Sequence, residues 1–357
     1  MILSLFGYPK TGKTLLFNLL TNQHEQVSKF SLPSVECHKA VVDVPDPRLT
    51  QLAEISGTPP VHAKIEYLDT GFIAKDEVKD STFIDLLRRA DGLVHLVRGF
   101  VDPEIPHPQG TVDPQRDIRS MEDELVTVDF VTIGKRLEKL AADLKKIKNH
   151  ELEEEAAVLG KIKGLLEAGQ PLRAVPLNEK ERTLLRGFKP LSAKPLLHVI
   201  NADENSLERY TPLVSPPPPH QQLTTVIFAG KIEQELLELN PDERPVFQRE
   251  YGLQEYHYLR DGFINTSFTL MNLISFFTIG KEETKSWTVE KETTAFQAAG
   301  KIHSDIQRGF IRAEVINWQD FLSCGGFAHG REKGLLRLEG KDYSVRDGDV
   351  IHFRFNA

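Results

Sequence analysis

The sequence predicts an α/β protein with a parallel sheet covered by helices, a helical insertion within that sheet domain, and a smaller α+β domain at the end. Strand-like apolar runs alternate with helical patterns over residues 1–118 and 191–279, the order expected of a parallel sheet with helices on its faces. Between them, residues 119–190 are strongly helical. Residues 280–357 turn to short strands and turns, which predicts a separate small domain.

Length and composition fit this organisation. A chain of 357 residues predicts two or three domains, and 40% apolar with 27% charged residues is typical of a globular protein, not of a collagen-like or disordered one. No apolar run reaches the roughly 18 residues that a bilayer span needs. The start lacks a basic segment and a cleavage site, so we expect a cytoplasmic protein with no membrane partner. The two cysteines, Cys37 and Cys324, have no metal-site spacing.

The net charge limits which kinds of molecule the protein is expected to bind. There are 44 basic and 52 acidic residues, a net charge of −8. A uniformly basic surface is therefore excluded, and DNA is not an expected partner, although a local basic stripe remains compatible with this total.

The predicted strands and helices of the sheet domain alternate along the chain. An apolar strand over residues 2–6 is followed by a glycine-bounded loop and a helix that begins near Leu15. An apolar segment near the end of this domain, Phe268 to Phe277, is predicted to be helical. Further strands are expected at 40–44, 63–68, 93–97, 196–200 and 224–228, with helices at 83–89 and 232–239.

The insertion is predicted to be two antiparallel helices. Leucines and isoleucines recur at spacings of three and four on both sides of a turn at 148–150, which gives a narrow apolar seam. Either the hairpin is merely solvated, or its basic first arm contacts a nucleic-acid phosphate backbone. The basic residues of that arm are Lys135, Arg136, Lys139, Lys145, Lys146 and Lys148.

The strongest motif lies between the first strand and the first helix. Residues 7–14 read Gly-Tyr-Pro-Lys-Thr-Gly-Lys-Thr and fit G-x-x-x-x-G-K-[ST], a phosphate-binding loop in its required strand-loop-helix context. Backbone amides and the helix N-terminus favour phosphate oxygens. We expect Lys13 to bridge the terminal phosphates and the Thr14 hydroxyl to bind Mg²⁺. The residues expected to line the nucleotide here are Gly7, Pro9, Lys10, Thr11, Gly12, Lys13, Thr14 and Leu15.

Two further strand ends carry candidate polar groups. Asp69 follows a buried strand and is the expected carboxylate of the metal site, with a simple turn as the alternative. Asn201-Ala202-Asp203-Glu204 follows another buried strand, where GTPase-type proteins read the base with N-K-x-D. Ala202 lacks the lysine stem and Glu204 is one methylene longer than aspartate, so guanine specificity is not expected. Ala229 and Gly230 lie where a backbone amide would face the base.

Together these motifs resemble the YchF (Obg-like ATPase) family. The resemblance rests on residues 7–14, 44–55 and 201–204 and on C-terminal runs between 298 and 350, such as Gly340-Lys341-Asp342-Tyr343, and it covers nearly the whole chain. It implies a GTPase-type P-loop NTPase domain (1–118 and 191–279), an inserted coiled-coil hairpin (119–190) and a ubiquitin-like TGS domain (280–357). It also implies that ATP is preferred over GTP, and that the partner is the ribosome or ribosomal RNA.

The resemblance assigns roles to four more residues. Ser34 stands where the family has the threonine that completes the Mg²⁺ shell, and Phe100 matches a phenylalanine near the adenine, with a buried core ring as the alternative. Phe72 replaces a water-positioning glutamine. His107 aligns with a histidine proposed to handle the proton of the attacking water, a task that suits imidazole, although its flanking prolines would stiffen the loop.

The sequence departs from the family in the second switch, where residues 72–80 form a shorter loop with fewer glycines. Lys10 and Thr11 also replace the usual asparagine and valine. We therefore expect a slow Mg²⁺-dependent ATPase that acts on a ribosomal partner. Two alternatives stay open: a nucleotide-gated binding module with little hydrolysis, and a GTPase.

Overall fold

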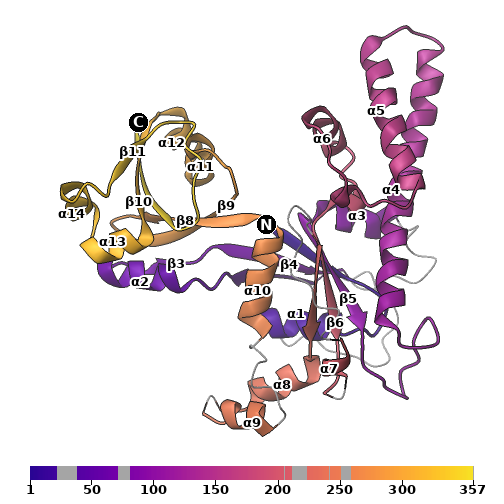
Figure 1. Cartoon of the computed structure of the whole chain (residues 1–357), viewed down its shortest axis with the longest axis horizontal. Helices are drawn as coiled ribbons and strands as arrows, with labels where there is room; N and C mark the ends of the chain where they lie inside the picture. Colours follow the sequence, from indigo (N-terminus) through magenta and orange to yellow (C-terminus); the bar gives the residue numbers. More distant parts are fainter. Residues whose placement is uncertain are drawn as a thin grey trace. The chain divides into compact units, whose positions relative to one another are not determined.

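The computed structural model forms two compact units (Figure 1). The N-terminal unit comprises Met1–Val41 and Glu66–Leu259, and the C-terminal unit comprises Val42–Ile65 and Arg260–Ala357. No helix among the residues described is long and apolar enough to cross a membrane. The described residues are 1–21, 38–70, 81–204, 206–210, 223–240, 242–250 and 259–356.

The N-terminal unit is built on a six-stranded sheet of order β2-β4-β1-β5-β6-β7. From β4 through β1, β5 and β6 to β7, each neighbouring pair is parallel. The two central strands β5 and β6 are buried along their whole length, as expected when helices cover both faces. The strands are β1 (Ile2–Phe6), β2 (His38–Asp43), β4 (Lys64–Asp69), β5 (Gly92–Arg98), β6 (Leu196–Asn201) and β7 (Leu223–Phe228).

Helices α3 and α4 pack on one face of this sheet. Phe6 and Leu93 from the strands share a buried cluster with Leu87 of α3 and Leu125 of α4. The helices of the unit are α1 (Lys13–Thr21), α3 (Ser81–Arg89), α4 (Pro114–Leu144), α5 (His150–Glu167), α6 (Glu179–Arg186), α7 (Leu207–Tyr210), α8 (Gly230–Glu238) and α9 (Arg244–Glu250), with 3-10 turns at Leu172–Ala174 and Leu191–Ala193.

The predicted helical hairpin consists of α4 and α5, which run side by side (Figure 1). Leu140, Leu159 and Ile162 are fully buried along the seam between them. Asn149 caps α5, because its side chain accepts a hydrogen bond of 2.8 Å from the Glu151 amide. Helix α4 begins at residue 114, so its first turns pack on the sheet and root the hairpin in the N-terminal unit.

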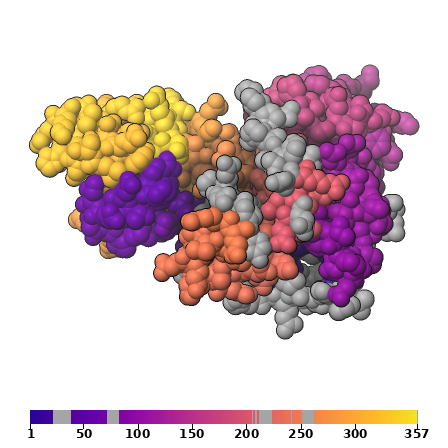
Figure 2. Space-filling model, turned by 60° about the horizontal axis from the view of Figure 1, so that its bottom comes forward, coloured from indigo at the N-terminus to yellow at the C-terminus, as the bar shows by residue number. Residues whose placement is uncertain are grey.

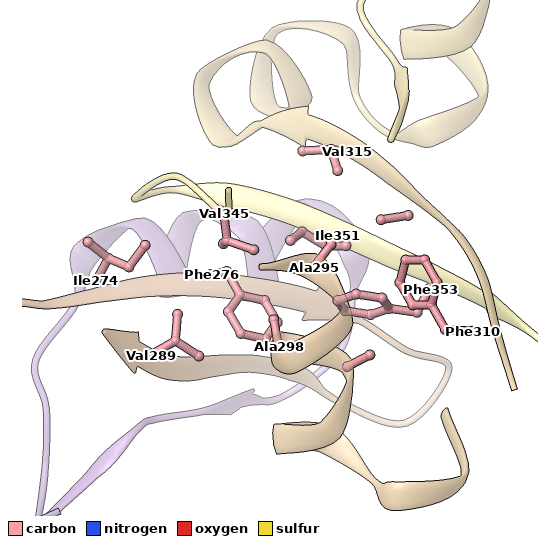
Figure 3. Close-up of a cluster of buried hydrophobic side chains, with 12 residues drawn as sticks. Ile274, Phe276, Val289, Ala295, Ala298, Phe310, Val315, Val345, Ile351 and Phe353 are labelled. Carbon is pink, nitrogen blue, oxygen red and sulfur yellow. The ribbon is translucent and has the colours of Figure 1, made fainter. Parts of the chain in front are cut away.

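The C-terminal unit has a second six-stranded sheet of order β11-β10-β12-β8-β9-β3. Its main hydrophobic cluster contains side chains such as Phe276, Phe310 and Phe353 (Figure 3), and the carboxylates of Glu314 and Asp349 are buried in the same unit. The strands are β3 (Pro60–Val61), β8 (Leu273–Ile279), β9 (Thr284–Glu290), β10 (Phe310–Asn317), β11 (Arg337–Glu339) and β12 (Asp349–Phe355). The helices are α2 (Pro47–Ser56), α10 (Leu259–Leu270), α11 (Ala295–Ile302), α12 (Ser304–Arg308), α13 (Trp318–Cys324) and α14 (Phe327–Glu332).

Helix α2 belongs to the C-terminal unit, although we placed all of residues 1–118 in the first domain. Leu49 and Leu52 are fully buried in a cluster with Phe277 and Val350, and Figure 2 shows α2 (violet) against the yellow end of the chain. The amphipathic pattern of α2 marks one apolar face but does not say which core receives it.

The boundary before the last domain also differs from the one we expected at residue 280. The structure breaks the predicted helix Phe268 to Phe277, because α10 ends at Leu270 and β8 begins at Leu273. The run Ile-Ser-Phe-Phe-Thr-Ile is rich in β-branched and aromatic residues, and it pairs with β9 along its length. The helical prediction for this segment was therefore wrong.

Candidate functional site: a phosphate-binding loop at the sheet edge

The phosphate-binding loop joins β1 to α1, at the carboxyl edge of the sheet. Gly7 and Gly12 have φ of 142° and 100°, values that favour glycine. A Cβ on Gly7 would lie 2.3 Å from the Leu96 carbonyl oxygen, and one on Gly12 would lie 2.3 Å from Asn201 Nδ2. The loop therefore needs glycine at both positions, for conformation and for space.

Lys13 is held inside this loop. Its Nζ donates hydrogen bonds to the carbonyl oxygens of Gly7 (3.1 Å) and Tyr8 (2.8 Å). Burial lowers the pKa of Lys13 to about 8, against the opposing attraction of Asp69. A desolvated ammonium beside the backbone amides of the loop favours a bound anion, because the anion would stabilise the charged form of Lys13 that burial disfavours.

Thr14 and Asp69 lie together, as a metal site requires. The Thr14 hydroxyl donates a hydrogen bond of 3.0 Å to Asp69 Oδ2. The strand end is fixed by Thr70, whose hydroxyl donates to the Leu5 carbonyl oxygen at 2.7 Å. Hydroxyl and carboxylate oxygens are ligands that suit Mg²⁺, so these two residues fit the ion. Ser34, the third predicted ligand, lies outside the described residues, as does the shortened second switch with Phe72.

Asn201 connects the phosphate-binding loop to the start of α8. Its Nδ2 donates to the Thr11 carbonyl oxygen at 2.9 Å, and its Oδ1 accepts from the Gly230 amide at 3.2 Å. Ala202 is buried, and Glu204 is exposed after the strand. The side chain of Asn201 therefore fixes the frame of the site, and among the four residues of this motif Glu204 offers the exposed carboxylate.

The other predicted residues of the phosphate-binding loop lie around this frame. Pro9 and Lys10 are half-buried at its tip, where Lys10 has a φ of 59° and partial burial lowers its pKa. The Thr11 hydroxyl donates to the Tyr8 carbonyl oxygen at 3.1 Å. Leu15 lies in the first turn of α1, which packs against α8, the helix that begins next to Ala229.

Arg98, which sequence reasoning missed, organises the loop after β5. Its guanidinium donates hydrogen bonds to the carbonyl oxygens of Phe100 (3.1 Å), Ile105 (2.9 Å) and Asp102 (3.3 Å). It also lies over the Phe100 ring, 4.6 Å from the centroid. The sequence did contain a signal for this role, an arginine at the end of a mostly apolar strand, because a buried charge needs several partners.

His107 lies next to the phosphate-binding loop but is engaged by its own surroundings. Its ring packs edge-on against Tyr8, with 6.2 Å between centroids. Its Nδ1 accepts from the Gln109 amide at 3.1 Å, and its Nε2 lies 3.1 Å from Asp117 Oδ2. Burial lowers the pKa of His107, although Asp117 opposes this. The structure thus places His107 near the site, with its Nδ1 hydrogen-bonded and its Nε2 beside the Asp117 carboxylate.

Comparisons with known proteins agree with this geometry. Residues 2–151 match a family described as 50S ribosome-binding GTPase, and residues 273–356 match the YchF-GTPase C-terminal family, described as a protein of unknown function (DUF933). The ribosome-binding ATPase YchF of Bacillus subtilis is 35% identical over 98% of both chains. The chain belongs to the YchF family. The ribosome-binding ATPase YchF of Escherichia coli O157:H7 is also 35% identical over 98% of both chains.

Solved structures support the fold of this YchF family member. The Schizosaccharomyces pombe YchF GTPase has a TM-score of 0.82 at 27% identity, covering 99% of this chain and 97% of that one. A Pyrococcus horikoshii GTP-binding protein, at 18% identity and a TM-score of 0.55, shares the fold. YchF relatives are thus named both as ATPases and as GTPases, and the residues around Asn201 carry the question of which base this chain reads.

Proposed function

We propose that this protein is a slow, Mg²⁺-dependent ATPase that binds the ribosome in the cytoplasm. The observation that carries the proposal is the convergence of Lys13, Thr14 and Asp69 at the phosphate-binding loop: a desolvated ammonium, a hydroxyl and a carboxylate beside backbone amides. This set of groups suits phosphoryl transfer, which depends on positioning and on electrostatic stabilisation of the phosphates.

Different residues would bind the phosphates and the metal ion. The amides of the loop and the N-terminus of α1 would bind the phosphate oxygens, while Lys13 would turn from the carbonyl oxygens of Gly7 and Tyr8 to the terminal phosphate. Thr14 and Asp69, with Ser34 as the third predicted ligand, would hold Mg²⁺. When bound, the ion neutralises phosphate charge and orients the terminal phosphate.

His107 is our candidate for handling the proton of the attacking water. Because its Nδ1 accepts from the Gln109 amide and its Nε2 faces Asp117, one of these interactions has to break first. That requirement gives a physical reason for slow turnover. Substituting His107→Ala should lower the rate of hydrolysis while ATP affinity stays unchanged.

Base preference follows from the Asn201 motif. GTP readers use an aspartate that accepts two hydrogen bonds from guanine, whereas here the exposed carboxylate is Glu204, and Ala202 covers no ring. We therefore propose ATP as the substrate, with Phe100 and the loop at Ala229 and Gly230 near the base. Competition binding tests this, because tighter binding of GTP would overturn it.

Hydrolysis is tested by phosphate release from ATP with Mg²⁺. The expected result is slow release by the wild-type protein and none above background by Lys13→Ala. If the two proteins release phosphate equally, the enzyme proposal fails. Nucleotide binding without release would leave the binding-module alternative.

The tip of the hairpin is the surface that we propose for the ribosome. Lys145, Lys146 and Lys148 are exposed there, and Ile147 between them is 64% exposed. Arg136 is not available in the same way, because it forms a bidentate pair with Glu155 at 2.7 Å. The tip therefore offers positive charge to RNA phosphates.

Co-sedimentation with ribosomes tests this surface. Replacing the three tip lysines by glutamine should weaken binding and flatten its dependence on salt. The matched control replaces three exposed lysines of the C-terminal unit, Lys281, Lys291 and Lys301, with the same loss of charge. Equal effects of the two triple variants would refute the assignment to the tip.

A further inference from the structure

A line of polar side chains runs from the base of the hairpin toward the phosphate-binding loop. His95 of β5 and His198 of β6 face each other across the parallel pair, with 3.0 Å between their Nδ1 atoms. His198 Nε2 lies 3.3 Å from Glu122 Oε1 on α4. Arg173, which follows α5, donates to Glu122 Oε2 at 2.5 Å. Both histidines are almost completely buried.

Glu122 fixes where the protons of this line reside. Burial alone would raise the pKa of Glu122, but hydrogen bonds from His198 and Arg173 outweigh burial and lower it, so the carboxylate is ionised and only accepts. His198 must then carry its proton on Nε2. Its bare Nδ1 accepts from His95 Nδ1–H, and His95 is left with an unprotonated Nε2.

The free edge of His95 faces the phosphate-binding loop. Its Cδ2, the atom bonded to Nε2, lies 3.3 Å from the position that a Cβ on Gly7 would take. Nε2 itself is buried, and no hydrogen-bond partner for it occurs in the part of the chain that the structure describes. The pKa of His95 falls well below its usual value through burial, then through the charges of His198 and Lys13. His95 therefore presents a lone pair within electrostatic reach of Lys13.

Helix α4 reaches the loop by a second contact as well. The hydroxyls of Tyr8, in the loop, and Ser120, on α4, lie 3.2 Å apart. Ser120 and Glu122 are close together on the helix that continues outward as the first arm of the hairpin. Helix α4 thus reaches the loop by two routes: directly through Ser120 and Tyr8, and indirectly from Glu122 through His198 and His95.

We propose that Glu122, His198 and His95 are positioning residues that let the base of the hairpin set how tightly the phosphate-binding loop holds nucleotide. The proposal rests on the nucleotide site proposed above and adds a residue-level connection to it. By thermodynamic linkage, a partner that shifts the hairpin base changes nucleotide affinity, and nucleotide changes partner affinity by the same factor.

The key variant is Glu122→Gln, which keeps the shape and removes the charge. A glutamine amide can donate to His198 Nε2, so both histidine tautomers can reverse and His95 can present an N–H toward Lys13. We expect ATP affinity of the full-length protein to fall about three- to tenfold, a usual size for such coupling. The matched control is Asp123→Asn, an exposed carboxylate on the next residue of α4.

Nitrogen NMR of the imidazoles supplies a readout that a purely structural role would not move. In the wild-type protein, His95 should be protonated on Nδ1 and His198 on Nε2, and Glu122→Gln should change both. Arg173→Met, which keeps Glu122 but removes its partner, should weaken ATP binding in the same direction. It also serves as the test if Glu122→Gln fails to fold.

A double-mutant cycle decides whether the residues act as one line. Glu122→Gln and His198→Phe should be clearly non-additive in ATP affinity, because either one breaks the same connection. Additive effects, or ATP affinity in Glu122→Gln equal to that in Asp123→Asn, would overturn the proposal. A wild-type protein that binds no ATP would instead refute the proposed function, and the tautomers would still be readable.

Discussion

The two units bury different charged and titratable groups. Beside its apolar cluster of Phe276, Val315 and Phe353 (Figure 3), the C-terminal unit buries the carboxylates of Glu314 and Asp349, each of which pairs with a partly exposed arginine. The N-terminal unit buries Lys13, His95, His198 and Arg98 next to its apolar clusters. Buried polar groups lose solvation and need specific partners, so they add less to stability than apolar contacts of equal size. The difference teaches that the N-terminal unit is less stable than it could be, because it buries Lys13 and the two histidines at and beside its candidate site.

The largest effect should come from the apolar core. Phe276 is fully buried, so Phe276→Ala should lower the free energy of unfolding of the C-terminal unit by about 3–5 kcal/mol, with ATP affinity unchanged. Thermal and denaturant unfolding measure the first quantity, and nucleotide titration measures the second. Lys291→Ala, at an exposed position after β9, is the control. A loss of ATP affinity without unfolding would show that the two cores are not independent.

In contrast to Phe276→Ala, the substitution Lys13→Met should increase the free energy of unfolding. The pKa of Lys13 is lowered to about 8 from 10.5, so at pH 7 the folded state disfavours the ammonium by up to about 3 kcal/mol. The variant should therefore unfold at a higher denaturant concentration while losing ATP binding. In the wild-type protein the free energy of unfolding should rise as the pH increases from 8 to 10.5, because over this range the unfolded chain still holds the Lys13 proton that the folded state has lost. The variant should show no such rise. Lys139→Met, at an exposed position on α4, is the control.

The buried histidine pair should make the N-terminal unit sensitive to acid. Burial lowers the pKa of both His95 and His198, with Glu122 opposing the shift of His198. Below about pH 6.5 the unfolded chain binds protons that the folded unit excludes, so the free energy of unfolding should fall by up to about 1.4 kcal/mol per pH unit for each histidine. Unfolding at pH 7.5 and 5.5 measures the slope. Replacing both histidines by leucine should reduce it, and an unchanged slope would contradict this explanation.

The smallest effect should come from the polar edge of the C-terminal unit. Arg48 on α2 contacts Asp46 at 2.8 Å and Asp347 at 2.6 Å, and Asp347 is half-exposed. Asp347→Asn should lower the free energy of unfolding by about 1 kcal/mol or less, because Asp347 is half-exposed and water and salt screen its pair with Arg48. Adding salt should weaken the wild-type protein more than the variant. A loss as large as that of Phe276→Ala would contradict the ranking of the apolar core above the polar edge within this unit.

The sequence predicted the local features of the site well. The phosphate-binding loop is a contiguous motif, and parallel strands bring their carboxyl ends to one edge, so the proximity of Thr14 and Asp69 follows from the order of elements. The hairpin was also predictable, because its seam repeats along a single stretch of chain.

Features that depend on pairing between distant segments were not predictable. His95 and His198 are 103 positions apart, and each occurs in a strand that reads as an ordinary apolar run. Only the register of β5 against β6 brings them together. The unit in which α2 packs could not be predicted either, because the apolar face of one amphipathic helix could pack against either core.

The position of α2 has a consequence for how the chain is made. Leu49 and Leu52 share a buried cluster with Val350, which is synthesised 298 residues after Leu52 (350 − 52). At about 5–20 residues per second, the apolar face of α2 waits roughly 15–60 s for its partners. The C-terminal unit thus closes only after Val350 has been synthesised, and during that interval its first segment is a natural substrate for chaperones.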